Sequence, residues 1–128
     1  MTILRLALGG RFCRAAVYNG TVYLSGMTAD DLMEDTAGQT RAVLAKIDAH
    51  LRLAGSSKAG LLSATLWLRD IADFDAMNAA WDAWLDRGNM PVRATVEARL
   101  AGDRYRVEIM VIAAVESDAE DDKAGERA

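Results

Sequence analysis

The chain has 128 residues, of which 52% are apolar and 27% are charged, a composition typical of one globular domain with a single core. The net charge of −4 comes from residues 116–128, which carry six acidic and two basic side chains and leave residues 1–115 neutral. A neutral body excludes the basic surface by which proteins usually bind nucleic acid. We therefore expect one domain in residues 1–115 and an acidic, disordered tail in residues 116–128, which hold no large apolar residue.

Simple counts also exclude membrane spans and metal sites. The longest apolar run, residues 109–115, is too short to cross a bilayer, and the N-terminus lacks the pattern of a signal peptide. We therefore expect a cytoplasmic protein whose partners include neither a membrane nor a nucleic acid. One cysteine, Cys13, and one histidine, His50, are too few for a disulfide, a thiolate zinc site or a multi-histidine metal site. These counts predict no metal site, and no glycine loop has the spacing of a phosphate- or dinucleotide-binding site.

The N-terminal part of the chain predicts a β-hairpin. Residues 3–8 have the composition of a short strand. Asn19-Gly20 then separates two β-rich segments, residues 14–18 and 21–25. Asn-Gly between such segments is the strongest short signal for antiparallel strands joined by a tight turn.

Two helices and a buried strand are predicted next. Thr36 and Gln39 have the spacing of a capping box, and apolar residues recur at helical intervals behind them, which predicts a helix over 36–54. Residues 61–68 are apolar on both sides, as in a central strand. A second amphipathic helix is predicted from the acidic caps at 70–73 to the stop before residue 88.

The last two strands are predicted at 92–100 and 105–115, joined as a hairpin. Alternation places their apolar side chains on the core and Arg93, Thr95 and Glu108 on the opposite face. With Thr95 opposite Glu108, Arg93 lies diagonally within side-chain reach of Glu108. Such a pair can clamp a small carboxylate and move a proton, or it can be an idle surface ion pair. Spacing alone leaves both readings open.

The elements follow the order β-β-α-β-α-β-β, which predicts an α+β fold with two helices packed on one face of a sheet. The open face then carries Trp67, Met110 and Ile112, and is too apolar to remain in water. This favours a homo-oligomer packed through its sheets, with a ligand site between subunits.

Several stretches are distinctive when they occur together and in this order. They are Asn-Gly-Thr-Val-Tyr-Leu-Ser-Gly at 19–26, Asp-Phe-Asp-Ala-Met-Asn at 73–78, Pro-Val-Arg-Ala-Thr-Val at 91–96 and Val-Glu-Ile at 107–109. On these stretches the sequence resembles the Rid superfamily (reactive intermediate deaminases, the YjgF-type proteins), in the branch of small YoaB-like proteins. The resemblance covers about residues 10–115.

The resemblance implies a chorismate-mutase-like fold, a homotrimer with clefts between subunits, and no metal or organic cofactor. It implies a 2-imino acid/enamine deaminase that hydrolyses reactive imines, such as 2-aminoacrylate, to 2-keto acids and ammonia. The family's carboxylate-binding arginine corresponds to Arg93 and its water-positioning glutamate to Glu108. Its further substrate-binding positions correspond to Phe12, Ser25, Asn78 and Thr95.

Two other readings stay open beside the deaminase. Phe12 stands where the family often has tyrosine, so a hydroxyl is missing and the preferred imine is left open. A non-catalytic oligomer that binds small carboxylates or keto acids would keep Arg93 and would not need Glu108. A ribonuclease or translation inhibitor, as some relatives are described, is disfavoured by the neutral body.

Overall fold

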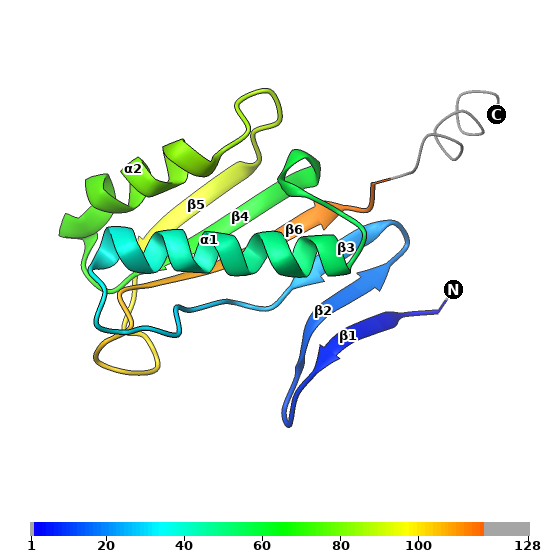
Figure 1. Cartoon of the computed structure of the whole chain (residues 1–128), viewed down its shortest axis with the longest axis horizontal. Helices are drawn as coiled ribbons and strands as arrows, with labels where there is room; N and C mark the ends of the chain where they lie inside the picture. The colour runs from blue at the N-terminus through cyan, green and yellow to red at the C-terminus, as the bar shows by residue number, and fades with distance from the viewer. Residues whose placement is uncertain (1, 117–128) are drawn as a thin grey trace.

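The computed structural model describes residues 2–116 and shows one mixed six-stranded sheet with two helices on one face (Figure 1). The strands and helices are β1 (Leu4–Leu8), β2 (Cys13–Tyr18), β3 (Thr21–Leu24), α1 (Thr36–Leu53), β4 (Leu61–Leu68), α2 (Phe74–Trp84), β5 (Val92–Glu97) and β6 (Val107–Ala114). Short 3-10 helices precede β4 and α2, η1 (Lys58–Gly60) and η2 (Ile71–Asp73). The predicted α+β fold with two helices on one face is confirmed. β1, expected as a short strand at 3–8, adds a sixth strand to the predicted order.

The strands lie side by side in the order β1-β2-β3-β6-β4-β5. All neighbouring pairs are antiparallel except β4 and β5, which are parallel. Parallel strands need a long crossover connection, and α2 with its flanking segments supplies it. Asn19 and Gly20 have φ of 53° and 77°, the conformation that a tight hairpin turn requires, and the predicted β2–β3 hairpin is confirmed.

The predicted hairpin between the last two strands is wrong. β4 lies between β5 and β6, so Thr95 is in register with Leu66 of β4, and Glu108 is opposite Trp67. The physical reason is that β4 is apolar on both sides and takes the central place, while β5 reaches the sheet edge through the α2 crossover. Residues 98–106 then return the chain across the end of β4 to begin β6.

The faces of β5 are also opposite to the prediction. Arg93 and Thr95 are in register with Ala64 and Leu66, which are 2% and 0% exposed under the helices, so their side chains point to the helical face. Val92, at 72% exposure, points to the open face instead. Glu108 does point to the open face, because its neighbours Val107 and Ile109 are fully buried against the helices. Arg93 and Glu108 therefore lie on opposite faces of the sheet and do not pair within one chain.

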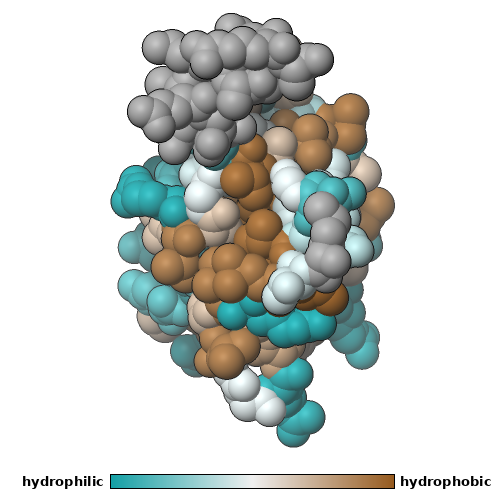
Figure 2. All heavy atoms as spheres, turned by 90° about the vertical axis from the view of Figure 1, so that its right-hand side faces the viewer, coloured by the Kyte–Doolittle hydropathy of each residue, from teal (hydrophilic) through white to brown (hydrophobic). Residues whose placement is uncertain are grey.

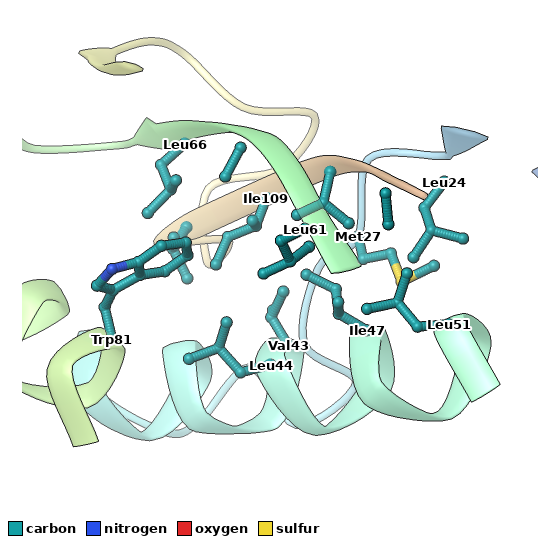
Figure 3. Close-up of a cluster of buried hydrophobic side chains, with 14 of the residues drawn as sticks. Leu24, Met27, Val43, Leu44, Ile47, Leu51, Leu61, Leu66, Trp81 and Ile109 are labelled. Carbon is teal, nitrogen blue, oxygen red and sulfur yellow. The ribbon is translucent and has the colours of Figure 1, made fainter. Parts of the chain in front are cut away.

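The core lies between the helices and the sheet. Figure 3 shows Leu44, Ile47 and Leu51 of α1 pointing up toward the sheet, with Trp81 of α2 beside them. They meet the buried side chains of β4 and β6, such as Ile109, which is fully buried. This packing fixes α2 over β4 and β5, and so determines the surroundings of Arg93.

The start of α1 differs in detail from the predicted capping box. Asp35 is the N-cap, and its carboxylate accepts the backbone N–H of Gly38 at 2.8 Å. Gln39 is fully buried instead and acts as a hub. Its Nε2 donates to the Glu34 and Arg104 carbonyls at 3.1 and 3.0 Å, and its Oε1 accepts the Arg106 N–H at 2.9 Å. One side chain thus holds the end of the 26–35 loop against the loop before β6.

β6 ends at Ala114, but the chain stays hydrogen-bonded one residue beyond the predicted domain limit of 115. Glu116, predicted as part of the tail, donates its backbone N–H to the Gly55 carbonyl at 2.8 Å. The remainder of the predicted disordered tail lies outside the described residues. None of the helices formed within residues 2–116 combines the length and the apolar character needed to cross a membrane. The cytoplasmic location stays a prediction.

Candidate functional site

The Arg93 guanidinium lies in an aromatic cradle under α2. Its central carbon is 5.8 Å from the Phe74 ring centre and 5.2 Å from the Trp81 ring centre, and Nη1 lies 3.9 Å from the Met77 sulfur. Within residues 2–116 no carboxylate lies within ion-pair distance of Arg93. Burial holds the pKa of Arg93 below its usual value, and the nearby Asp82 charge partly offsets this. A cation that is partly desolvated but not neutralised is well suited to bind an anion.

Arg93 opens into a hollow of about 390 Å³ between the end of α2 and the start of β5. The other lining residues are Asn78, Trp81, Asp82, Leu85, Arg87, Met90 and Pro91. The structure therefore brings together two of the predicted site residues, Arg93 and Asn78. The volume suits a small organic acid, and the wall mixes apolar side chains with a few polar groups, as ligand sites do.

Thr95 lies two residues beyond Arg93 on the same face of β5. Its hydroxyl is buried and has no hydrogen-bond partner within the part of the chain that the structure describes, residues 2–116. A buried hydroxyl without a partner is costly and uncommon, and it indicates a place where a ligand or a water completes the bonding. Arg93, Asn78 and Thr95 thus form one group of predicted residues, on the helical side of the sheet edge.

Glu108 forms a second group, on the opposite face. Its carboxylate lies directly over Gly26, so close that a Cβ atom at Gly26 would collide with Oε2. Within residues 2–116 the Glu108 carboxylate has no ion pair and accepts no hydrogen bond. Ser25, next to Gly26, also has a buried hydroxyl that finds no hydrogen-bond partner among the described residues. Sequence reasoning missed the role of Gly26, although the Ser-Gly pair of the 19–26 stretch was the signal for it.

A β-bulge shapes this second group. Tyr23 pairs with Ile112, and Met27 pairs with Ile109, so the β3 side contains one residue more than the β6 side. The extra residue falls in 24–26 and ends the regular strand. Bulges redirect side chains and are common next to functional sites. Here the bulge brings the Gly26 backbone against Glu108.

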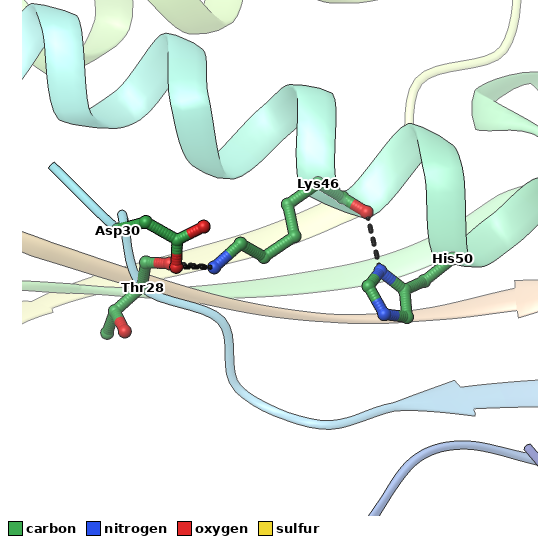
Figure 4. A network of polar contacts seen from close by, with 4 residues as sticks. All are labelled: Thr28, Asp30, Lys46 and His50. Carbon is green, nitrogen blue, oxygen red and sulfur yellow. Dashed lines mark hydrogen bonds and ion pairs between the residues drawn. The ribbon is translucent and has the colours of Figure 1, made fainter. Parts of the chain in front are cut away.

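Lys46 of α1 fastens the loop that follows Gly26. Its Nζ donates to the Thr28 carbonyl at 2.8 Å and pairs with the Asp30 carboxylate at 2.7 Å (Figure 4). The hydrogen bond and charge of Lys46 hold the pKa of Asp30 below its usual value. His50, one turn later, donates from Nδ1 to the Lys46 carbonyl at 2.8 Å, so its ring makes a hydrogen bond within α1 itself.

Phe12 belongs to neither group. It lies in the turn between β1 and β2, with 54% of its surface exposed, and its ring stacks under the Arg14 guanidinium at 5.1 Å. β1 and β5 are the two opposite edges of the sheet, so one chain does not bring Phe12 to Arg93 (Figure 1). The predicted site residues are therefore divided among the two faces and the far hairpin.

The chain is similar to known proteins over most of its length. A family model described as endoribonuclease L-PSP matches residues 2–115. The RutC family protein YoaB of Escherichia coli is 45% identical over 115 residues, which cover 90% of this chain and 100% of that protein. A crystal structure of a YjgF family member from Neisseria meningitidis is 44% identical, with a TM-score of 0.89, and covers 91% of this chain and 98% of that one. A rat protein named 2-iminobutanoate/2-iminopropanoate deaminase is 26% identical over 110 residues, or 81% of this chain and 80% of the rat protein.

Proposed function

The chain belongs to the endoribonuclease L-PSP family, which includes the YjgF-type and RutC proteins, and on this basis we propose that it is an imine deaminase. The reaction is the hydrolysis of small 2-imino acids and their enamines to 2-keto acids and ammonia. The observation that carries the proposal is the Arg93 guanidinium, which is partly desolvated, has no acidic partner among residues 2–116, and opens into a hollow of about 390 Å³. The name of the rat relative supports this reaction class.

The chemistry needs few groups, because an iminium carbon is already electrophilic. Arg93 binds the substrate carboxylate through two parallel N–H···O bonds and fixes the orientation of the C=N bond. Water adds through its oxygen to the imine carbon, and Glu108 accepts the proton that the water releases. Glu108 then returns this proton to nitrogen, the C–N bond breaks as the hydroxyl on the same carbon loses its proton to solvent and becomes the keto oxygen, and the nitrogen leaves as ammonia. Two residues of this chain thus account for binding and proton transfer.

Arg93 and Glu108 can act on one substrate only if two copies of the chain meet. We propose that the β5 edge of one subunit, with exposed Val92 and Val96, packs against the open sheet face of the next subunit, which carries Glu108. A ring of three copies closes such a contact between unlike surfaces. The unpaired hydroxyls of Ser25 and Thr95, one in each group, are the donors that a ligand in this cleft would use.

The distribution of apolar surface supports association. Besides the two valines of β5, the exposed large apolar side chains include Leu4 and Leu8 of β1, Tyr23 of β3 and Met110 of β6. Figure 2 views the end of the molecule on which the β1–β2 hairpin lies, and a broad apolar area covers its middle. Contiguous apolar surface of this kind usually marks a protein interface.

The test is release of keto acid from imines that an amino-acid oxidase produces in the same solution. We expect the wild-type chain to accelerate the release, Arg93→Ala to abolish the acceleration, and Glu108→Gln to reduce it about 10²- to 10⁴-fold, the usual contribution of a general base. Arg52→Ala removes an exposed arginine at the end of α1 and serves as the matched control. No acceleration by the wild type with any of several amino acids would refute the proposal.

A non-catalytic binder of small carboxylates or keto acids is the second candidate. The observation that favours it is the placement of Arg93 and Glu108 on opposite faces of one chain. Calorimetry of 2-ketobutyrate binding to Glu108→Gln, set beside the rate of that variant, separates the two candidates. Retained binding with a lost rate supports the enzyme, whereas retained binding with an unchanged rate supports the binder.

We do not propose ribonuclease activity for this chain. Residues 1–115 carry no net charge, which gives RNA little electrostatic attraction. Filter-binding assays from low to high salt check this. RNA binding at low salt that falls steeply as the salt concentration rises would favour a nuclease.

A further inference from the structure

Asp82 is a charged group in the Arg93 hollow to which the proposed reaction assigns no role. It lies on α2 four residues after Asn78, so both side chains share a helix face and both line the hollow with Arg93. Its only ion-pair contact within residues 2–116 is a loose one, 3.9 Å from its Oδ1 to Nη2 of Arg87, and its side chain is 56% exposed. Two guanidiniums, Arg87 and Arg93, and the Asp82 carboxylate therefore face the same hollow, and Asp82 forms no ion pair with Arg93.

The gap between these two opposite charges has the pattern of a zwitterion site. If Asp82 were an ordinary partner of Arg93, the two would form an ion pair, but no such pair exists. Asp82 is nevertheless close enough for its charge to raise the pKa of Arg93 against the effect of burial. A small ligand between them can place its carboxylate on Arg93 and a cationic nitrogen toward Asp82.

The substrate and product of the proposed reaction differ in this respect. A 2-imino acid that is protonated on nitrogen carries a carboxylate and, on the next carbon, a cationic iminium group. The 2-keto acid product carries the same carboxylate but has a neutral carbonyl oxygen in place of the nitrogen. Arg93 alone does not distinguish the two molecules, whereas a carboxylate opposite the nitrogen attracts the first and repels the second.

We propose that Asp82 is a specificity-determining residue that makes the Arg93 hollow prefer zwitterionic iminium substrates to anionic keto acids. This inference rests on the proposed function, because it assumes that the substrate binds at Arg93. Its consequence is that the product, once the nitrogen has left as ammonia, is repelled from the site that held the substrate. Arg87 partly neutralises Asp82 and so moderates the preference.

The test uses two stable probes with the same carbon skeleton. 2-Aminobutyrate is a zwitterion and stands in for the iminium substrate, and 2-ketobutyrate is the anionic product. Trp81 lines the hollow, so quenching of its fluorescence reports binding, and calorimetry gives the affinities. The protein is the full chain in the assembly that it forms in solution.

We expect Asp82→Asn to bind 2-ketobutyrate about three- to tenfold more tightly and 2-aminobutyrate about three- to tenfold more weakly, the size expected for one charge in a wet hollow. Asp75→Asn removes the same charge from the same helix but outside the hollow, and should change both affinities less than twofold. Arg87→Ala should shift the preference further toward the zwitterion. Identical behaviour of Asp82→Asn and Asp75→Asn would overturn the inference.

Other outcomes separate this inference from the proposed function. If the wild type hydrolyses no imine but Asp82→Asn still shifts the preference from 2-aminobutyrate toward 2-ketobutyrate, the reaction is wrong and the zwitterion site stands. If imines are hydrolysed and the inhibition constant of 2-ketobutyrate is the same for wild type and Asp82→Asn, the reaction stands and the inference is wrong. If Arg93→Ala changes the affinity for neither probe, the hollow is not the ligand site and both are refuted.

Discussion

Gly26→Ala is the substitution that tests most directly how the fold positions Glu108. The added Cβ would overlap Oε2 of Glu108 and lie 3.2 and 3.5 Å from its Cδ and Cγ atoms. Gly26 is not among the glycines with positive φ, so its backbone conformation accepts alanine. The perturbation is therefore purely steric, and the Glu108 carboxylate is the group that must move.

The expected effect on stability is small. The collision falls on the far end of a flexible side chain, and moving it to a poorer rotamer costs about 0.5–1.5 kcal/mol. Replacing glycine by alanine where the backbone permits it gains about 0.4–1 kcal/mol through the unfolded chain. These two contributions nearly cancel, so we expect a shift of Tm of no more than a few degrees.

The expected effect on activity is large, because a displacement of about 1 Å at a reacting group costs on the order of 10²-fold in rate. The assay is keto-acid release by the wild type and Gly26→Ala, together with calorimetric titration with 2-ketobutyrate. We expect kcat/KM to fall about 100-fold while 2-ketobutyrate affinity and Tm stay nearly unchanged. In the Glu108→Gln background Gly26→Ala should have little further effect, since both changes act on one group.

Gly10→Ala is the matched control, because no atom lies within 4 Å of a Cβ at Gly10. Full activity in Gly26→Ala would refute the claim that the rate depends on where the Glu108 carboxylate lies. A loss of stability above about 3 kcal/mol, of the size seen for disrupted cores, would refute the steric argument instead, since it would mean that the carboxylate cannot move aside.

The remaining predictions concern the buried Gln39 side chain, the Arg93 guanidinium, and the loop that Lys46 fastens. Gln39→Leu should lower the free energy of unfolding by about 3–5 kcal/mol, because it leaves two carbonyls and one N–H unpaired in a buried place; urea denaturation measures this, and a loss below 1 kcal/mol would contradict it. Arg93→Lys keeps the charge but loses the planar fork, so 2-ketobutyrate affinity should fall about tenfold or more by calorimetry; unchanged affinity would show that bidentate binding is not used. Lys46→Met should lower Tm at pH 7. Since Lys46 depresses the pKa of Asp30, this contribution is present above the ordinary value of 3.8 and is lost as pH falls below it. Thermal scans from pH 7 to pH 3 should therefore show the difference between Lys46→Met and wild type narrowing, and a constant difference would exclude the ion pair as its source.

The local elements of this protein follow from its sequence. Asn19-Gly20 specifies the β2–β3 turn because both residues tolerate positive φ. Residues 61–68, apolar on both sides, form the predicted strand β4, and it is central. The alternation of β6 also gave the correct face for Glu108, because strands on both sides of β6 and helices above it bury every second residue.

For β5 the same alternation predicted the wrong face of the sheet for its side chains, and only the tertiary structure shows why. A two-residue period tells which side chains share a face, but it does not tell which face is covered. At a sheet edge, Val92 and Val96 remain exposed, while the long Arg93 side chain extends under Phe74 and Trp81. The path of α2 also makes β4 and β5 parallel, which removes the hairpin that adjacency in sequence suggested.

The sequence by itself therefore determined the elements, the family, and the two residues proposed for the chemistry, Arg93 and Glu108. The tertiary structure decided that these residues lie on opposite faces of one sheet, that Gly26 positions Glu108, and that Asp82 shares the hollow with Arg93. The physical reason is that local periodicity and turn chemistry act over a few residues, whereas strand order and the covered face are set by packing between segments far apart in the chain.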